Sequence, residues 1–469
     1  MTAIQRLDSA GLRHALEGSL AISHAKVIVL QPDGARPVTQ SADLIEPHHM
    51  LRRPLELDAE SVNVEPRVPP SVLAHARTLR LANGLSVILA PSSTVPVVHV
   101  HLVFGAGMTT TPLRRVASTA IAALVRAIRP PRTAGLSPRW VTGMDTAEIT
   151  VSIPATELEA DLTFFGELPT ASDSFSDAVA KIVADVRPNS IAADAKASRD
   201  DDFYAHIYGD HPYGTARRED SPSAAPMQSD VETFYRQFLQ PDNATLIVTG
   251  GFDVDAVEPI VRRIFTPWTG SAQPHSLGKP MRQPGAAFAI NEATPWIALR
   301  IGWLAGPPDD DYAARQIIAA MIDRLMPRVR CAHLAYRVAS HYEVSGRLDP
   351  QNAATDIVHL RDAIAALADG SDASKQLFAV ARREVAIGES AGATSSAAWA
   401  TELTLAVAMG HDLAWRQQLA QRAAKVSYDD VKRLIAEELS PSAATWVLSG
   451  PGDKVAEIYA RLGLTVVSE

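Results

Sequence analysis

One spacing pattern occurs three times in this chain, and it constrains the fold more than any other feature. Apolar residues are separated first by a step of eight residues and then by a step of five. Each copy has the periodicity of an amphipathic helix, followed by a short turn and an apolar strand that ends at Gly or Pro. A unit that recurs after about 200 residues is too long for a solenoid repeat and predicts duplicated domains. The three copies are Leu12, Leu20 and Ala25; Val231, Leu239 and Ala244; and Val431, Leu439 and Ala444.

Length and composition are those of a globular protein with more than one domain. A chain of 469 residues is long enough for two or more hydrophobic cores. The net charge of -9 and the absence of a basic run argue against a nucleic-acid surface. The single cysteine, Cys331, excludes an internal disulfide framework, and it is predicted to be a buried structural thiol in a helix. Because the N-terminus lacks an apolar signal segment and no stretch is long enough to span a bilayer, a cytoplasmic protein is predicted.

Composition changes along the chain predict five segments. Seven prolines between 31 and 76 fix the backbone and remove donors, which is typical of a linker or an extended wrap. A Gly/Pro-rich stretch separates two longer regions that each mix strands with helices. The predicted segments are 1–30, a helix–strand remnant of a preceding repeat; 31–76, the Pro-rich linker or wrap; 77–270, an N-terminal domain; 271–285, a linker; and 286–469, a C-terminal domain.

Local patterns within the two domains predict an α+β fold. The segment 77–91 has Asn-Gly between two apolar runs, which is the strongest short-range signal for a hairpin. An Ala-rich helix is predicted at 113–128, because two prolines follow it. Residues 309–338 are predicted to be helical, and 341–348 to form a strand.

Two histidines on one predicted strand are the first candidates for metal chemistry. His99 and His101 alternate with apolar residues, so they share one face of the strand. Such a pair can chelate zinc, but zinc needs at least a third protein ligand. Asp145 and Glu148 could supply one, although their spacing gives no support for it. We therefore expect the two histidines to be exposed or core residues.

The segments LRLANGLSVILAP and PVVHVHLVFGAG begin the first domain, and YGDHPYG and FYRQFLQPDNATLIVTGGFD lie near its end. They resemble the opening and the end of the catalytic domain of the insulinase/pitrilysin (inverzincin) metallopeptidases, in the processing-peptidase-like subgroup. IALRIGWLAGPPDDDYAARQIIAAMI and LAYRVASHYEVSG resemble the partner domain. The resemblance spans about 77–469. It implies two homologous domains, each a mostly antiparallel sheet with helices packed on one face, arranged as half of a clam shell.

The chemistry of that family needs a helix with His-x-x-Glu-His. The two histidines bind zinc, the glutamate acts on the metal-bound water, and a second glutamate further along completes the ligands. At the equivalent positions this sequence has Ala120, Ala123 and Leu124, and the second glutamate would fall near Ala195, where only Asp194 is acidic. No His-x-x-Glu-His or its inverse occurs in the 469 residues. We therefore expect no catalytic residue, no metal ligand and no cofactor in this chain.

The second domain keeps part of a substrate-holding device that the resemblance implies. In the family, an arginine and a tyrosine of this region help to hold the substrate carbonyl. Here Ala335 stands at the place of the arginine, whereas Tyr342 keeps the tyrosine. Tyr342 is thus a candidate remnant of a peptide contact. The alternative is a tyrosine packed at a strand end.

The function implied is that of a catalytically inactive subunit. It would pair with a zinc-bearing homologue as a heterodimer, line a shared chamber for a peptide substrate, and have neither nucleic acid nor membrane as a partner. Zinc is expected only in the homologue. Two alternatives stay open, namely a structural assembly subunit of a larger complex and a stand-alone peptide- or leader-binding module.

Overall fold

The computed structural model describes residues 72–92, 95–113, 115–127, 138–167, 172–185, 203–216, 226–391 and 395–467. The predicted remnant at 1–30 and nearly all of the linker at 31–76 lie outside these residues. None of the helices in the described part of the chain is long and apolar enough to cross a membrane.

The first half of the described chain builds one mixed sheet, the N-terminal sheet. Its strands lie in the order β1-β2-β6-β3-β5-β4. The β2–β6 pair is parallel and every other neighbouring pair is antiparallel. The strands are β1 (Arg77–Arg80), β2 (Ser86–Pro91), β3 (Val97–Phe104), β4 (Arg139–Thr142), β5 (Ala147–Pro154) and β6 (Ala244–Gly250).

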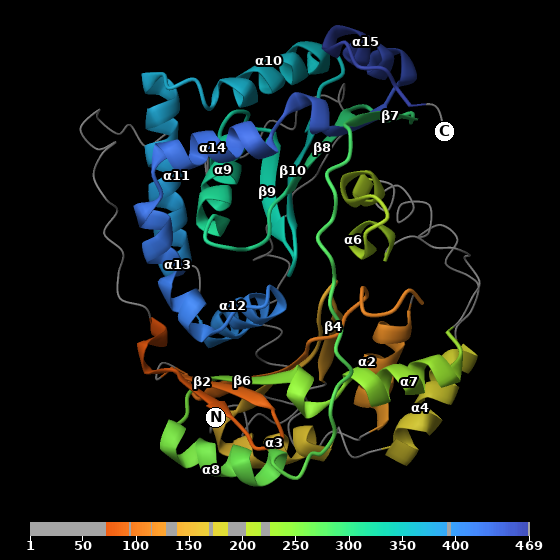
Figure 1. Ribbon diagram of the computed structural model, residues 1–469, viewed down its shortest axis with the longest axis vertical. Coiled ribbons are helices and arrows are strands. Elements are labelled where there is room, and N and C mark those ends of the chain that lie inside the picture. The colour runs from red at the N-terminus through yellow and green to blue at the C-terminus, as the bar shows by residue number, and fades with distance from the viewer. Residues whose placement is uncertain are drawn as a thin grey trace, which may run out of the picture. The chain divides into compact units, whose positions relative to one another are not determined.

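The second half builds the C-terminal sheet on the same plan (Figure 1). Its order is β7-β11-β8-β10-β9, and its one parallel pair, β11 with β7, corresponds to β6 with β2. Each strand therefore has a counterpart in the N-terminal sheet, with β1 as an addition at one edge. The strands are β7 (Ala286–Asn291), β8 (Ile297–Ala305), β9 (Val329–Ala335), β10 (Ser340–Leu348) and β11 (Thr445–Gly450).

The repeated spacing marks equivalent positions in the two sheets. Both copies consist of an α-helix, a short 3-10 turn that begins at a proline, and the strand that lies between a parallel and an antiparallel neighbour. Leu239 and Leu439 occupy the C-caps of the two helices and are buried. The copies are α7 (Gln228–Phe238), η7 (Pro241–Asn243) and β6; and α14 (Tyr428–Glu438), η8 (Pro441–Ala443) and β11. The copy at Leu12, Leu20 and Ala25 lies outside the described residues.

The predicted hairpin is formed by β1 and β2. Gly84 has a φ of +89°, a backbone conformation that glycine adopts without steric cost. The side-chain amide of Asn83 donates to the carbonyls of Phe265 and Trp268 at 2.8 and 2.7 Å. The turn is thus tied to the end of a helix about 180 residues later in the chain.

Helices cover one face of each sheet and enclose a hydrophobic core there. The helices on the N-terminal sheet include α2 (Val116–Ala127), α3 (Leu158–Glu167), α4 (Ser172–Asp185) and α8 (Val254–Phe265), together with α7. Those on the C-terminal sheet include α9 (Tyr312–Asp323), α10 (Ala353–Ala366), α11 (Asp372–Ala391), α13 (Leu413–Lys425) and α15 (Gly452–Leu462), together with α14. The predicted α+β architecture of two similar sheet-and-helix layers is confirmed.

One predicted element is wrong. The helix expected over 309–338 ends at Asp323, and Val329–Ala335 is the strand β9. Pro327 follows the helix, and the residues beyond it alternate between the two faces of a strand, with Val329 and His333 buried. Cys331 therefore lies on a strand, and its backbone N–H donates to Asp323. Burial raises the pKa of its thiol far above the usual range, so the sulfur stays protonated.

Candidate functional site

The helix that would carry the metal ligands is α2, and its ligand positions face the core. Ala120 and Ala123 are 0% exposed and Leu124 is 1% exposed. Alanine and leucine favour the helix, and their spacing of three and four residues places them on one apolar side. This side packs within the core that α2 shares with α4 and α7. The positions are therefore filled by close-packed hydrocarbon.

Aliphatic side chains have no lone pair to offer a cation, so these three positions of α2 cannot ligate zinc or act as a general base. Within the described residues, no group of three or more His, Cys, Asp or Glu side chains is placed to hold a metal ion. Asp194 and Ala195, where the further ligand was expected, lie outside those residues.

The strand histidines lie on the face of the N-terminal sheet opposite to α2. His99 Nδ1 lies 2.7 Å from the hydroxyl of Ser152, and burial together with the nearby His101 lowers the pKa of His99. His101 Nδ1 lies 3.1 Å from the hydroxyl of Thr404 and 3.6 Å from a carboxylate oxygen of Glu148. Thr404 belongs to α12 (Ser396–Ala408), a helix from the C-terminal part of the chain. The polar groups on this face thus connect the sheet to α12.

Asp145 forms hydrogen bonds that link the N-terminal domain to the C-terminal domain. Both of its carboxylate oxygens accept from the hydroxyl of Tyr213 at 2.9 Å, and one accepts from the backbone N–H of Arg337 at 2.9 Å. Burial raises the pKa of Asp145, although these hydrogen bonds oppose the shift. Burial and the neighbouring Asp145 raise the pKa of Tyr213 far above its usual value, so it donates as a neutral phenol. These hydrogen bonds stay within the protein and join the N-terminal domain to the C-terminal domain, so we call this cluster a structural joint.

His211 supports the same joint. It is the N-cap of α6 (Pro212–Thr215), where its Nδ1 accepts from the backbone N–H of Tyr213 at 3.2 Å. Its Nε2 lies 2.8 Å from the carbonyl of Gly278 in the segment that leads to β7. Burial lowers the pKa of His211, which favours the neutral ring that this capping arrangement requires.

A second polar cluster lies on the face of the C-terminal sheet opposite to α9. Arg300 donates to both oxygens of Glu343 at 2.9 and 3.2 Å, and the hydroxyl of Tyr204 donates to Glu343 at 3.4 Å. Burial opposes the charge on Glu343, but hydrogen bonds from His341 and Arg300 outweigh it and lower the pKa of Glu343 to about 2. Nδ1 of His341 lies 2.7 Å from the hydroxyl of Tyr208. These groups contact one another within the protein.

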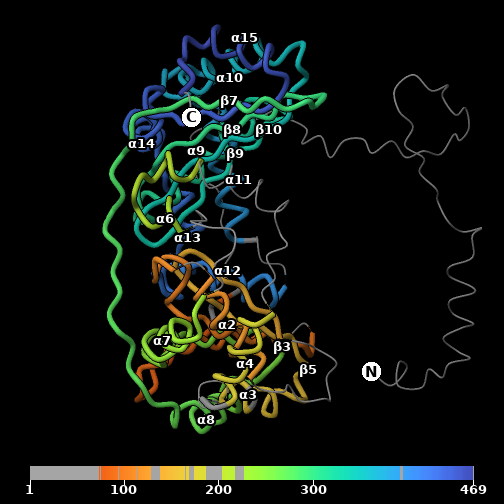
Figure 2. The backbone as a smooth tube through the Cα atoms, turned by 90° about the vertical axis from the view of Figure 1, so that its right-hand side faces the viewer, coloured from red at the N-terminus to blue at the C-terminus, as the bar shows by residue number. Residues whose placement is uncertain are grey.

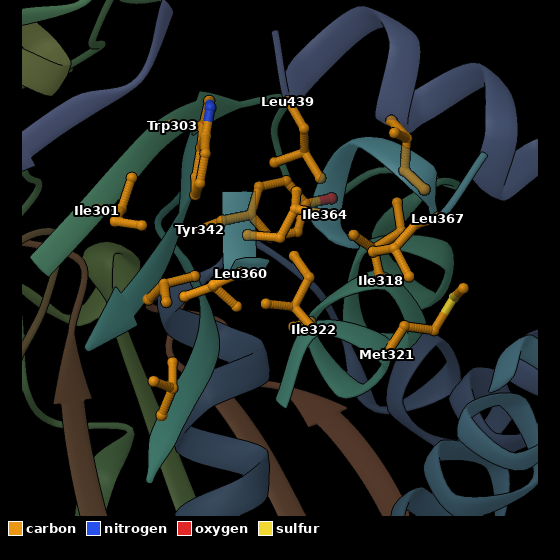
Figure 3. Close-up of a cluster of buried hydrophobic side chains, with 14 of the residues drawn as sticks. Ile301, Trp303, Ile318, Met321, Ile322, Tyr342, Leu360, Ile364, Leu367 and Leu439 are labelled. Atoms are coloured by element: carbon orange, nitrogen blue, oxygen red, sulfur yellow. The ribbon is translucent and has the colours of Figure 1, made fainter. Parts of the chain in front are cut away.

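Tyr342 does not lie on a surface. It is 0% exposed, and Figure 3 shows its ring within the C-terminal core, among side chains that include Trp303, Ile364 and Leu439. Its hydroxyl donates to Glu438 at 3.3 Å, and Glu438 in turn accepts from the buried Arg315 at 3.0 Å. The expectation of a peptide contact at Tyr342 is corrected, because no part of the side chain is accessible. Its role is to bond a buried carboxylate.

The feature that the sequence did not reveal is an exposed sheet edge beside α2. Among the described strands β4 pairs only with β5, so β4 is an edge strand of this sheet. Trp140 and Val141 of β4 are 39% and 56% exposed, and Leu113, just before α2, is 50% exposed. The strand Arg139–Thr142 is too short for an alternation to stand out, although its Trp-Val-Thr content is typical of strands.

Comparison with known proteins supports the resemblance. Residues 228–382 match the family model described as the Peptidase M16 inactive domain. No curated protein matches the sequence.

Solved structures of this type share the fold. A peptidase M16 inactive domain from Pseudomonas fluorescens is 17% identical, with a TM-score of 0.68 over 80% of this chain and 98% of that one. The first half of the periplasmic protease PqqL from Escherichia coli is 14% identical, with a TM-score of 0.64 over 86% of this chain and 100% of that one. A chain of complex III2 from Candida albicans is 12% identical, with a TM-score of 0.65 over 81% of this chain and 99% of that one.

Proposed function

We propose that this chain, which has the fold of an M16-peptidase half and matches the model of an inactive M16 domain, is a non-catalytic subunit that pairs with a zinc-bearing homologue. The homologue would supply the metal and the activated water. This chain would supply one wall of a shared chamber for a peptide. Its location in the cytoplasm is part of the same proposal.

The observation that supports this most is that α2 has aliphatic residues at the metal-ligand positions while the surrounding fold is well packed. In the described residues each sheet has a packed core, and Ala120, Ala123 and Leu124 are buried in the N-terminal one. A protein that had lost its purpose along with its metal would be under no pressure to keep two well-packed cores. Retained packing beside a hydrocarbon-filled metal position is consistent with a role for the shape of the chain rather than for its chemistry.

The exposed edge of β4 offers a place for an extended peptide. Main-chain hydrogen bonds to a sheet edge give affinity, and outward side chains such as Trp140 and Val141 supply apolar contact. Because α2 and β4 are in contact, this edge flanks the position of the missing metal. The same surface could equally be covered by the homologous partner, and the experiment below separates the two.

The test is co-expression with a homologue that contains an intact His-x-x-Glu-His. We expect the two chains to co-elute as a heterodimer that contains zinc and cleaves peptides in a chelator-sensitive way, whereas this chain alone does neither. Val141→Glu should raise the KM for peptide and leave the heterodimer intact if β4 binds peptide. If β4 lies at the subunit interface, the same variant should instead separate the subunits. Chelator-sensitive cleavage by this chain alone would contradict the proposal.

A structural assembly subunit is the second candidate function. The observation that favours it is the similarity to a chain of complex III2, although at 12% identity this shows a shared fold alone. In that case tagged protein would co-purify with a multi-subunit complex and not with a peptidase.

A further inference from the structure

Each sheet has its second face covered by a helix from the other part of the chain. The helical segment 203–208 belongs to the N-terminal part and packs on the C-terminal sheet. The helix α12 belongs to the C-terminal part and packs on the N-terminal sheet. We call these two segments the crossing helices. We propose that the crossing helices, rather than the covalent connection at 271–285, hold the two parts together, so that the chain stays one folded unit when that connection is cut.

The first crossing helix, 203–208, packs directly against a glycine of β8. A Cβ added at Gly302 of β8 would lie 2.6 Å from the ring of Phe203 and closer still to Ile207, so a larger residue at this position would displace the helix. The guanidinium group of Arg300 lies 4.0 Å from the centre of the Phe203 ring. Phe203 and Ile207 are both buried.

Hydrogen bonds fix the same helix to the sheet. The hydroxyl of Tyr208 and Nδ1 of His341 are 2.7 Å apart, and both side chains are fully or almost fully buried. Tyr213, a few residues further on, donates to Asp145, which also accepts from the backbone N–H of Arg337. Separation of this helix from the C-terminal sheet would break the contact between Tyr208 and His341 and the bond from Arg337 to Asp145.

The second crossing helix makes the reciprocal contact. Trp399 and Leu403 of α12 form a buried cluster with Ile88, Val103 and Ile247 of the N-terminal sheet. The hydroxyl of Thr249 donates to the carbonyl of Ser396 at 2.7 Å, which is the start of the helix. Leu403 is completely buried, so the cluster is a core of its own between the two parts.

The covalent connection has the opposite character. The chain between α8 and β7 runs without regular structure, as the green segment of Figure 2 shows. Most of its residues are exposed, and Met281 is 78% exposed. A Cβ added at Gly278 would meet no other atom within 4 Å, so the space beside this residue is open, although its carbonyl contacts His211. The segment therefore contributes little to the burial that joins the two parts.

The test is an inserted recognition site for a sequence-specific protease between Lys279 and Pro280 of the full chain, beyond the Gly278 carbonyl that His211 contacts. After complete cleavage we expect both fragments to co-elute in size-exclusion chromatography at the volume of the uncut protein. We also expect them to stay associated in urea, with a dissociation midpoint that rises with fragment concentration towards the unfolding midpoint of the uncut protein. Fragments that separate in buffer without urea would overturn the proposal.

A matched pair of variants distinguishes association through the crossing helices from non-specific association of the fragments. Gly302→Val places a side chain where Phe203 and Ile207 pack on β8. We expect the cleaved fragments of this variant to separate at a urea concentration at least twofold lower than the cleaved fragments of the wild type. Ala298→Val introduces the same residue on the same face of β8, two residues before Arg300. We expect the urea concentration at which its fragments separate to match that of the wild type. Equal dissociation of the two variants would also contradict the proposal. The test uses the lone chain, so its result does not depend on the proposed pairing with a homologue.

Discussion

The hydroxyl of Tyr213 donates to both carboxylate oxygens of Asp145 at 2.9 Å, and the two residues lie 68 positions apart in the sequence. Asp145 also accepts from the backbone N–H of Arg337, which is 192 positions away. One buried carboxylate therefore bonds to groups from both parts of the chain. Such joints fix the shape that the proposed function depends on.

The coupling between Asp145 and Tyr213 should be large. We expect a double-mutant cycle of Asp145→Ala and Tyr213→Phe, measured by urea unfolding at pH 7, to give a coupling energy of about 1–3 kcal/mol, because the bond is buried and one partner is a carboxylate. The control is the exposed pair Glu457 and Arg461, for which about 0.3–0.5 kcal/mol is expected. Equal couplings in the two cycles would show that Asp145 is not a joint.

Restoring the catalytic glutamate to α2 should damage the protein. Ala123→Glu places a carboxylate in a core position without a partner, and we expect it to lower the free energy of unfolding by about 3 kcal/mol or more. Arg126→Glu introduces the same residue on the exposed side of α2 and should change stability by less than about 0.5 kcal/mol. Circular dichroism melts of both variants decide this. A tolerated Ala123→Glu would mean that the face of α2 is open to solvent.

Glu343 should make the stability depend on pH. The folded state holds the pKa of Glu343 at about 2, below the ordinary value of 4.5, so its contribution is present above pH 4.5 and is lost as the pH falls towards 2. A depression of this size corresponds to about 3 kcal/mol, and Glu343 is buried enough for most of it to apply. The stability difference between the wild type and Glu343→Gln should therefore shrink between pH 5 and pH 3.

Asp145 acts in the opposite sense. Its pKa is raised by burial, so folding favours the protonated acid, and that contribution is lost as the pH rises through the folded pKa. For this reason the Glu343→Gln comparison is best repeated in an Asp145→Asn background. A stability difference that stays constant from pH 5 to pH 3 in that background would contradict the assignment to Glu343.

Tyr342 should matter for stability alone. Tyr342→Phe removes the hydroxyl that donates to Glu438, and we expect a loss of about 1 kcal/mol, because Arg315 and the backbone N–H of Gly306 still bond that carboxylate. The affinity of the heterodimer for peptide should not change. A changed KM at unaltered stability would restore the peptide contact that the sequence suggested.

The sequence predicted best where a local pattern has a local cause. Asn83 and Gly84 predict their turn because only a few residues tolerate that backbone, and the eight-and-five spacing predicts a helix, a turn and a strand because one face of each is buried. The sequence failed at Val329–Ala335, because a short apolar run has no unambiguous period.

Neither the crossing helices nor the burial of Tyr342 could be predicted from the sequence. The position of Tyr342 depends on which face of β10 meets α9 and α14, and that is settled only when the sheet is assembled. Phe203 packs against Gly302, although the two residues are about a hundred positions apart in the sequence. No pattern in either segment indicates this contact.

The measurement that tests the central claim most directly is metal analysis combined with peptide cleavage, on this chain alone and on the chain mixed with a homologue that contains His-x-x-Glu-His. We predict no stoichiometric zinc and no chelator-sensitive cleavage for the lone chain, and one zinc per heterodimer with chelator-sensitive cleavage for the mixture. Stoichiometric zinc and cleavage in the lone chain would contradict the account.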